Sequence, residues 1–166
     1  MGVTVRIENA ALHKFNARMK DIIKADGVGG VRIGIFEDAT NTVTGEHIAS
    51  YAACNEFGHD NTPPRPFMRM TLDKNIGKWA SIFTKSLQGQ VGDNPAAIRR
   101  AFTMLGRMGQ ADMQAMIRSN MPPPNKPETR ARKEARGGYA GTLVDTGEML
   151  KSVEYQLFNT DGSLSE

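Results

Sequence analysis

Alternation of apolar and polar residues predicts three strands in this chain. The alternating apolar positions are Val3, Val5 and Ile7, then Val31, Ile33 and Ile35, and finally Val153, Tyr155 and Leu157. A period of two places every second side chain on the same face of a strand, so each predicted strand has one buried face.

Apolar residues at three- and four-residue spacing predict the helices between these strands. Residues 9–24 form the first, with Leu12, Phe15, Met19, Ile22 and Ile23 on one face. Short helices are expected over 46–57, ending at Gly58, and over 145–151. Two longer helices are expected, one with the stripe Leu72, Ile76, Trp79, Phe83 and Leu87, and one that starts at Asp93 or Asn94 and carries Ile98, Phe102, Leu105, Met113 and Met116. The resulting order predicts an α+β fold, a small and mainly antiparallel sheet covered by helices.

Prolines interrupt these patterns at two places. Pro63, Pro64 and Pro66 restrict residues 62–69 to an extended path that presents side chains. Residues 120–141 are polar, basic and rich in proline and glycine. We therefore expect a long loop or arm there, with at most one or two helical turns.

Length and composition describe one folded domain over residues 1–166. Hydrophobic residues make up 39% of the 166 residues and charged residues 23%, and no apolar run is long enough for a membrane span. The single cysteine, Cys54, cannot form an internal disulfide, so we expect assembly in a reducing cytoplasm.

The net charge of +3 is unevenly distributed. Residues 96–138 hold nine basic and three acidic side chains, which gives +6, so the rest of the chain carries −3. Such a chain can associate head to tail with copies of itself or meet an acidic partner, although a solvated charged loop explains any single charge equally well.

Catalytic and ligand-binding patterns are weak in this sequence. Cys54 with His47 or His59 is the only thiol–imidazole option, and a lone cysteine on a packed helix is usually a small buried hydrophobe. The neighbouring His47, His59, Asp60 and Glu56 match no zinc or calcium spacing. We therefore expect no enzyme, no cofactor and no metal site.

Two segments carry a resemblance to a known family. Residues 49–58 (ASYAACNEFG), 63–69 (PPRPFMR) and 72–73 (LD) resemble the signature A…xEFG…IPxRPFxR…xxD of the tail-completion and neck (virion morphogenesis) proteins of tailed bacteriophages. Residues 121–129 (MPPPNKPET), Lys133 and residues 143–152 (LVDTGEMLKS) look like the PPPNxPxTxxxK…LVDTGxLxxS segment of the same group. In many relatives the TGxLxxS element precedes the EFG…RPF element, whereas here it follows.

This resemblance implies a structural virion protein without catalytic activity. It would be a ring subunit at the head–tail junction, assembled in the host cytoplasm, that meets copies of itself and portal, connector, tail-tube or terminator proteins. We expect no membrane contact and no specific contact with DNA. A nucleic-acid-binding module that uses the basic residues 118–136 is the alternative.

The candidate contact residues lie in the proline-rich segments. Phe67 would be the apolar anchor, and Arg65 and Arg69 would pair with carboxylates of a neighbouring subunit. An equally supported alternative is that Phe67 packs inside its own chain. Residues 120–141 would reach over an adjacent subunit with Arg130, Arg132 and Lys133. Other residues of the two motifs are expected to have a structural role instead of contacting a partner. These residues are Gly58, Pro63, Pro64, Pro66, Asp145 and Gly147.

Overall fold

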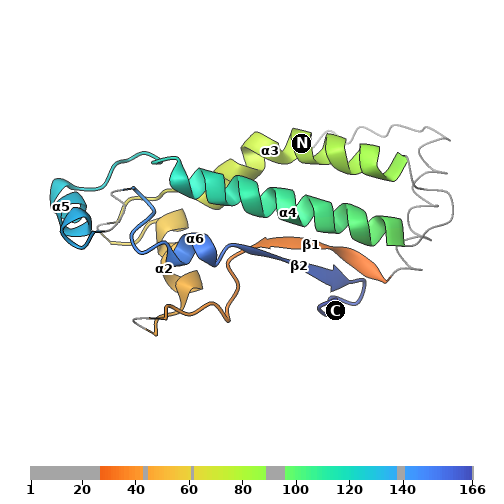
Figure 1. The fold of residues 1–166 in the computed structure, drawn as a ribbon, viewed down its shortest axis with the longest axis horizontal. Helices are drawn as coiled ribbons and strands as arrows, with labels where there is room; N and C mark the ends of the chain where they lie inside the picture. Colours follow the sequence, from red (N-terminus) through yellow and green to blue (C-terminus); the bar gives the residue numbers. More distant parts are fainter. Residues whose placement is uncertain (1–26, 43–44, 61, 89–95, 138–140, 166) are drawn as a thin grey trace, which may run out of the picture.

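The computed structural model describes residues 27–42, 45–60, 62–88, 96–137 and 141–165. The predicted strand over Val3–Ile7 and the predicted helix over 9–24 lie outside the described residues. Within the described part the chain has an α+β fold, with a small antiparallel sheet and helices (Figure 1). The elements in chain order are β1 (Val28–Gly34), α2 (Ile48–Phe57), α3 (Phe67–Gln88), α4 (Ala96–Arg118), α5 (Pro127–Ala135), α6 (Glu148–Lys151) and β2 (Glu154–Asn159).

The sheet consists of two antiparallel strands in the described part of the chain. β1 pairs with β2 so that Ile33 lies opposite Tyr155 and Val31 lies opposite Leu157. Two of the three alternating segments thus form strands, and they become neighbours although more than a hundred residues separate them.

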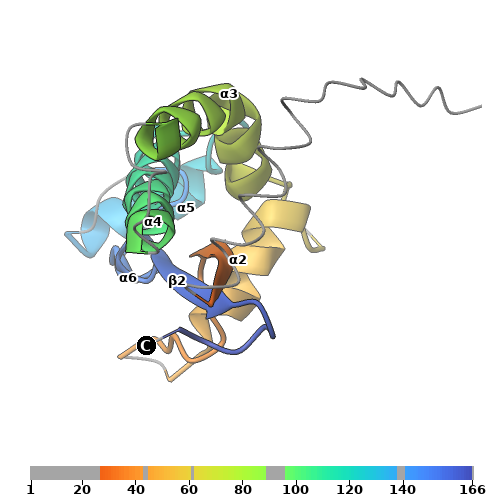
Figure 2. The same ribbon diagram turned by 90° about the vertical axis from the view of Figure 1, so that its right-hand side faces the viewer.

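α4 lies between α3 and the sheet. Figure 2 shows this arrangement along the long axis of the molecule, with α3, α4 and the two strands following one another. Glycines let α4 approach the sheet closely: a Cβ atom at Gly106 would overlap the ring of Tyr155, and one at Gly109 would overlap Ile33. Helix and sheet therefore pack backbone against side chain at these two positions.

The main hydrophobic core lies where α2, the start of α3, the end of α4 and the segment before β2 meet. Phe67 is fully buried at its centre, and a smaller cluster around Leu87 and Ile98 fills the opposite end of α3 and α4. The buried apolar members of the main core are Ile48, Ala52, Phe67, Met113, Met116, Ile117, Met121, Leu143, Val144, Met149 and Val153.

Both proline-rich segments differ from the expected extended paths. α3 begins at Phe67, so Phe67 and Arg69 belong to a helix, and residues 63–66 before them belong to neither a helix nor a strand. The expected arm contains the nine-residue helix α5, for which Pro127 supplies a favourable first position. No helix among the described residues has the length and apolar character that crossing a bilayer requires.

Candidate functional site

Glu56, at the end of α2, stabilises the start of α3. Its carboxylate accepts hydrogen bonds from the backbone N–H groups of Met68 (2.9 Å) and Arg69 (3.2 Å), and from Nε of Arg69 (2.9 Å). The first amides of a helix have no partner within the helix, and a negative charge there is favourable. Glu56 is only 2% exposed, so the carboxylate acts as a helix cap in a buried position.

Arg65 joins the first motif segment to the second. Its Nε donates to the carbonyl oxygen of Pro123 (2.9 Å), and its Nη2 lies 3.2 Å from Oδ1 of Asn125 and 3.5 Å from the carbonyl oxygen of Pro124. Arg65 is 5% exposed, and burial lowers the pKa of its guanidinium from the usual value. The partners of this guanidinium among the described residues are backbone and amide oxygens, which accept its hydrogens and so stabilise the buried cation.

Lys133, on α5, holds the loop that precedes α6. Its Nζ donates to the carbonyl oxygens of Gly141 (2.8 Å) and Val144 (2.7 Å) and lies 3.5 Å from that of Thr142. Burial is the main cause that lowers the pKa of Lys133, and the nearby Asp145 carboxylate opposes that shift. The ammonium group of Lys133 therefore forms its hydrogen bonds within the chain and stabilises the loop before α6.

We expect Lys133→Met to lower the free energy of unfolding by about 1.5–3 kcal/mol, because buried carbonyls lose a charged donor. The difference between wild type and variant should widen as the pH rises toward 10.5. In that range the unfolded lysine still binds a proton that the folded one has lost, so deprotonation favours the folded state. Urea unfolding curves over a pH series measure both effects. Lys126→Met, at an exposed lysine on the same segment, is the control, and an equal loss of stability in both variants would contradict the role of Lys133.

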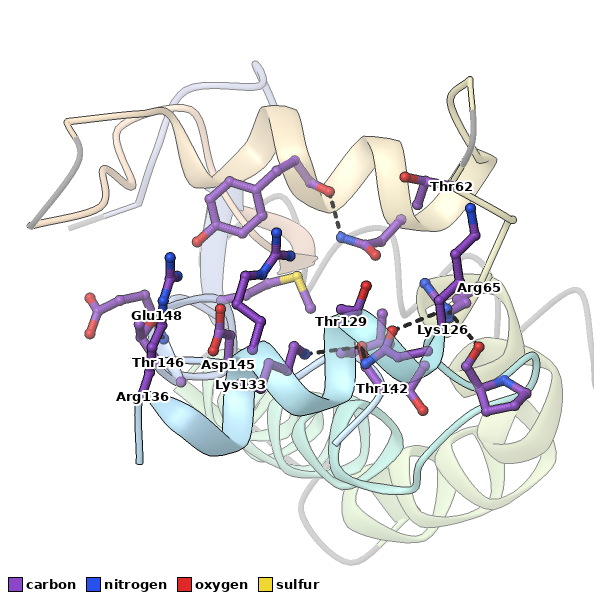
Figure 3. Close-up of a pocket in the computed structure, with 18 of the residues that line it drawn as sticks. Thr62, Arg65, Lys126, Thr129, Lys133, Arg136, Thr142, Asp145, Thr146 and Glu148 are labelled. Atoms are coloured by element: carbon purple, nitrogen blue, oxygen red, sulfur yellow. Dashed lines mark hydrogen bonds between the residues drawn. The ribbon is translucent and has the colours of Figure 1, made fainter. Parts of the chain in front are cut away.

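These contacts surround a pocket of about 650 Å³. Figure 3 shows Arg65, Lys133 and Thr142 among its lining residues, with the hydrogen bonds that join the two motif segments. The pocket contains both signs of charge. Its charged lining residues are Arg65, Lys126, Arg132, Lys133 and Arg136, together with Glu46, Asp145 and Glu148.

The residues of the weak catalytic and metal patterns lie on α2, at its N-cap and in the turn that follows it. Glu56 is occupied as a helix cap, and His59 pairs with Asp60 on the surface (2.9 Å). Among the described residues no three His, Cys, Asp or Glu side chains are grouped so that they could hold a metal ion. Cys54 is a half-buried free thiol on α2.

The candidate contact residues divide into internal and exposed ones. Arg65, Phe67 and Lys133 are buried within the chain, so these side chains do not offer a surface to a neighbouring subunit. For Phe67 the structure therefore agrees with the intramolecular alternative. Arg69, Arg130 and Arg132 remain exposed, and the side chain of Arg69 is 58% accessible and lies over the ring of Phe57 at 5.3 Å.

The expected backbone positions have the geometry that glycine permits. Gly58 ends α2 with φ +81°, and Gly147 precedes α6 with φ +84°, a region that other residues rarely adopt. Pro63 lies in the pocket wall, and Pro66 directly precedes α3. The sequence predicts no role for Glu56 or Asn125, although both stand in the quoted motifs, because contacts between distant segments leave no local spacing pattern.

Comparisons of the chain with protein-family models, with curated proteins and with solved structures find no match.

Proposed function

We propose that this chain is a structural virion protein of a tailed bacteriophage that acts as a ring subunit at the head–tail junction. The two motif segments support this proposal, because both resemble neck and tail-completion proteins. A match of short strings gains weight when the matched residues form one physical unit.

The observation that carries the proposal is that the motif residues contact one another. Glu56 of the first segment caps the helix that starts at Phe67, and Arg65 binds the backbone at Pro123 in the second segment. Lys133 binds the backbone of residues 141–144, where the LVDTG element begins. The signature residues thus depend on one another, which is what a shared fold would require of them.

Exposed groups remain for subunit contact. Arg130 and Arg132 lie on the exposed side of α5, and Phe57 is 69% exposed beneath the guanidinium of Arg69. Arginines and aromatic side chains of this kind frequently dominate the energy of protein interfaces.

The test is complementation of a phage that lacks this gene with the double variant Arg130→Glu/Arg132→Glu. We expect the number of joined, infectious particles to fall at least about tenfold, because charge reversal at an interface weakens association. Electron micrographs should show heads and tails that are separate. Lys85→Glu, at an exposed position far along α3, is the control.

One outcome would contradict the assigned contact surface, and another would contradict the junction role. Normal joining by the double variant would exclude α5 as the contact surface, and normal joining in the absence of the gene would exclude the junction role itself. Salt-dependent DNA binding by the purified protein that the double variant abolishes, with joining unaffected, would favour the nucleic-acid alternative.

A further inference from the structure

The pocket between α2, α5 and the loop before α6 is bordered by segments that hydrogen bonds within the chain fix in place. Lys133 attaches α5 to the carbonyl oxygens of Gly141 and Val144. Arg65 attaches the residues before α5 through the carbonyl oxygen of Pro123. The volume of about 650 Å³ lies within the range of ligand pockets. Walls that exist before a ligand arrives keep the entropic cost of binding low.

One side of α5 lines this pocket with cations along its length. Lys126, Arg132 and Arg136 belong to the lining, together with Thr129 and Lys133. Figure 3 shows Lys126 and Arg136 at opposite ends of this row, with Thr129 and Lys133 between them. From Lys126 to Arg136 the row extends over roughly 15 Å in helical geometry. The pocket therefore presents an elongated row of positive charge.

The exposed cations of this row have no ionic partner in the described part of the chain. No acidic side chain there lies within salt-bridge distance of Lys126, Arg132 or Arg136. Glu148, one of the acidic lining residues, already pairs with Lys151 (3.2 Å). The lining as a whole holds more basic than acidic side chains, so it attracts acidic groups.

The other lining residues favour a polypeptide over a nucleic acid. The carboxylates of Asp145 and Glu148 would repel the closely spaced phosphates of a nucleic acid. The same carboxylates can accept hydrogen bonds from the backbone N–H groups of a polypeptide. Tyr51 is the one aromatic side chain of the lining among the described residues, which leaves little surface on which bases could stack.

An extended polypeptide also matches the row of cations in length. Its side chains at alternate positions point to the same face, and three of them extend over roughly 13 Å. The rise along a helix from Arg132 to Arg136 is about 6 Å, close to the separation of about 6.6 Å between alternate side chains of a strand. Carboxylates at alternate positions can therefore meet successive cations of α5.

We propose that this pocket binds an extended segment of a partner protein that carries acidic side chains at alternate positions. Lys126, Arg132 and Arg136 bind the carboxylates of this segment, and Asp145 accepts a hydrogen bond from its backbone. This binding does not depend on the proposed virion role, and the purified chain suffices to measure it.

Isothermal titration of the full chain with an acidic hexapeptide tests the proposal. The hexapeptide alternates glycine and glutamate and has blocked ends, so its only charges are three carboxylates. We expect this peptide to bind, and we expect the matching peptide with glutamine in place of glutamate to bind at least about tenfold more weakly. Absence of binding, or equal affinity for the two peptides, would overturn the proposal.

Charge reversal within the pocket locates the binding site. Arg132→Glu/Arg136→Glu should weaken binding of the acidic hexapeptide at least about tenfold. The control Lys85→Glu/Arg107→Glu changes the net charge equally at exposed positions outside the pocket, and it should change the affinity less than about twofold. Equal weakening by both double variants would mean that net charge, and not the pocket, attracts the peptide. If charge reversal prevents folding, Arg132→Gln/Arg136→Gln takes its place.

Two further titrations identify the class of ligand. A hexathymidylate that bound more tightly than the acidic hexapeptide would assign the pocket to nucleic acid, and inorganic phosphate that bound as tightly as the peptide would assign it to a single anion. Either result would overturn the proposal. We expect both to bind more weakly than the peptide, since neither offers a backbone N–H group to Asp145.

Discussion

Replacement of Phe67 by alanine is expected to lower the free energy of unfolding by about 3–5 kcal/mol. Phe67 has no exposed surface and lies among buried side chains of α2, α4 and the segment before β2. Removal of the ring deletes its buried apolar area and leaves a cavity that these elements cannot readily close. Thermal unfolding should show a midpoint about 6–20 °C below that of the wild type.

Phe57→Ala is the matched control, because Phe57 is the same residue type and 69% exposed. We expect this variant to lose less than about 1 kcal/mol, chiefly from the contact with Arg69. Unchanged stability of Phe67→Ala, together with loss of association, would mean that the ring anchors a partner.

The second large effect is expected at Glu56. Glu56→Ala should cost about 2–4 kcal/mol, because the amides of Met68 and Arg69 lose their acceptor in a buried place and the start of α3 loses its negative charge. Chemical denaturation measures this loss. Circular dichroism should also show partial loss of helix before the main transition.

Two variants sharpen the test of the cap. Glu56→Gln keeps one oxygen acceptor without the charge, so its stability should lie between those of wild type and Glu56→Ala. Glu134→Ala removes an exposed carboxylate on α5 and should have an effect below about 0.5 kcal/mol. If Glu56→Ala resembled Glu134→Ala, the first turn of α3 would need no cap from α2.

The sequence patterns predicted most of the described helices and strands, because periodicity reports which face of an element is buried. β1, β2 and the helices α2 to α4 occupy the expected regions, with shifted ends. α3 begins five residues earlier than the apolar stripe indicates, since the cap from Glu56 stabilises a first turn that contains Phe67. Such a stabilising contact comes from another helix, so no local pattern reveals it.

Prediction of the candidate site was less successful for a related reason. Arg65 and Lys133 are charged, and proline-rich surroundings favour exposure, yet both are buried because backbone carbonyls accept their hydrogens. Carbonyl groups are present at every residue, so the sequence does not indicate which of them will surround a cation. The exposed groups, Arg69, Arg130 and Arg132, were among the predicted contact residues, but nothing in the sequence distinguished them from the buried ones.

The contact of Arg65 with Pro123 links chain positions 58 residues apart, and between them lie α3 and α4, of 22 and 23 residues. The two helices are nearly equal in length and run in opposite directions, so α4 ends close to the point where α3 begins. One extra turn in a single helix would separate Arg65 from Pro123 by about 5 Å, whereas a turn added to both at the Leu87 end would leave that contact in place. A change in helix length at the Leu87 end therefore preserves the contact of Arg65 with Pro123 only when α3 and α4 change by the same number of turns.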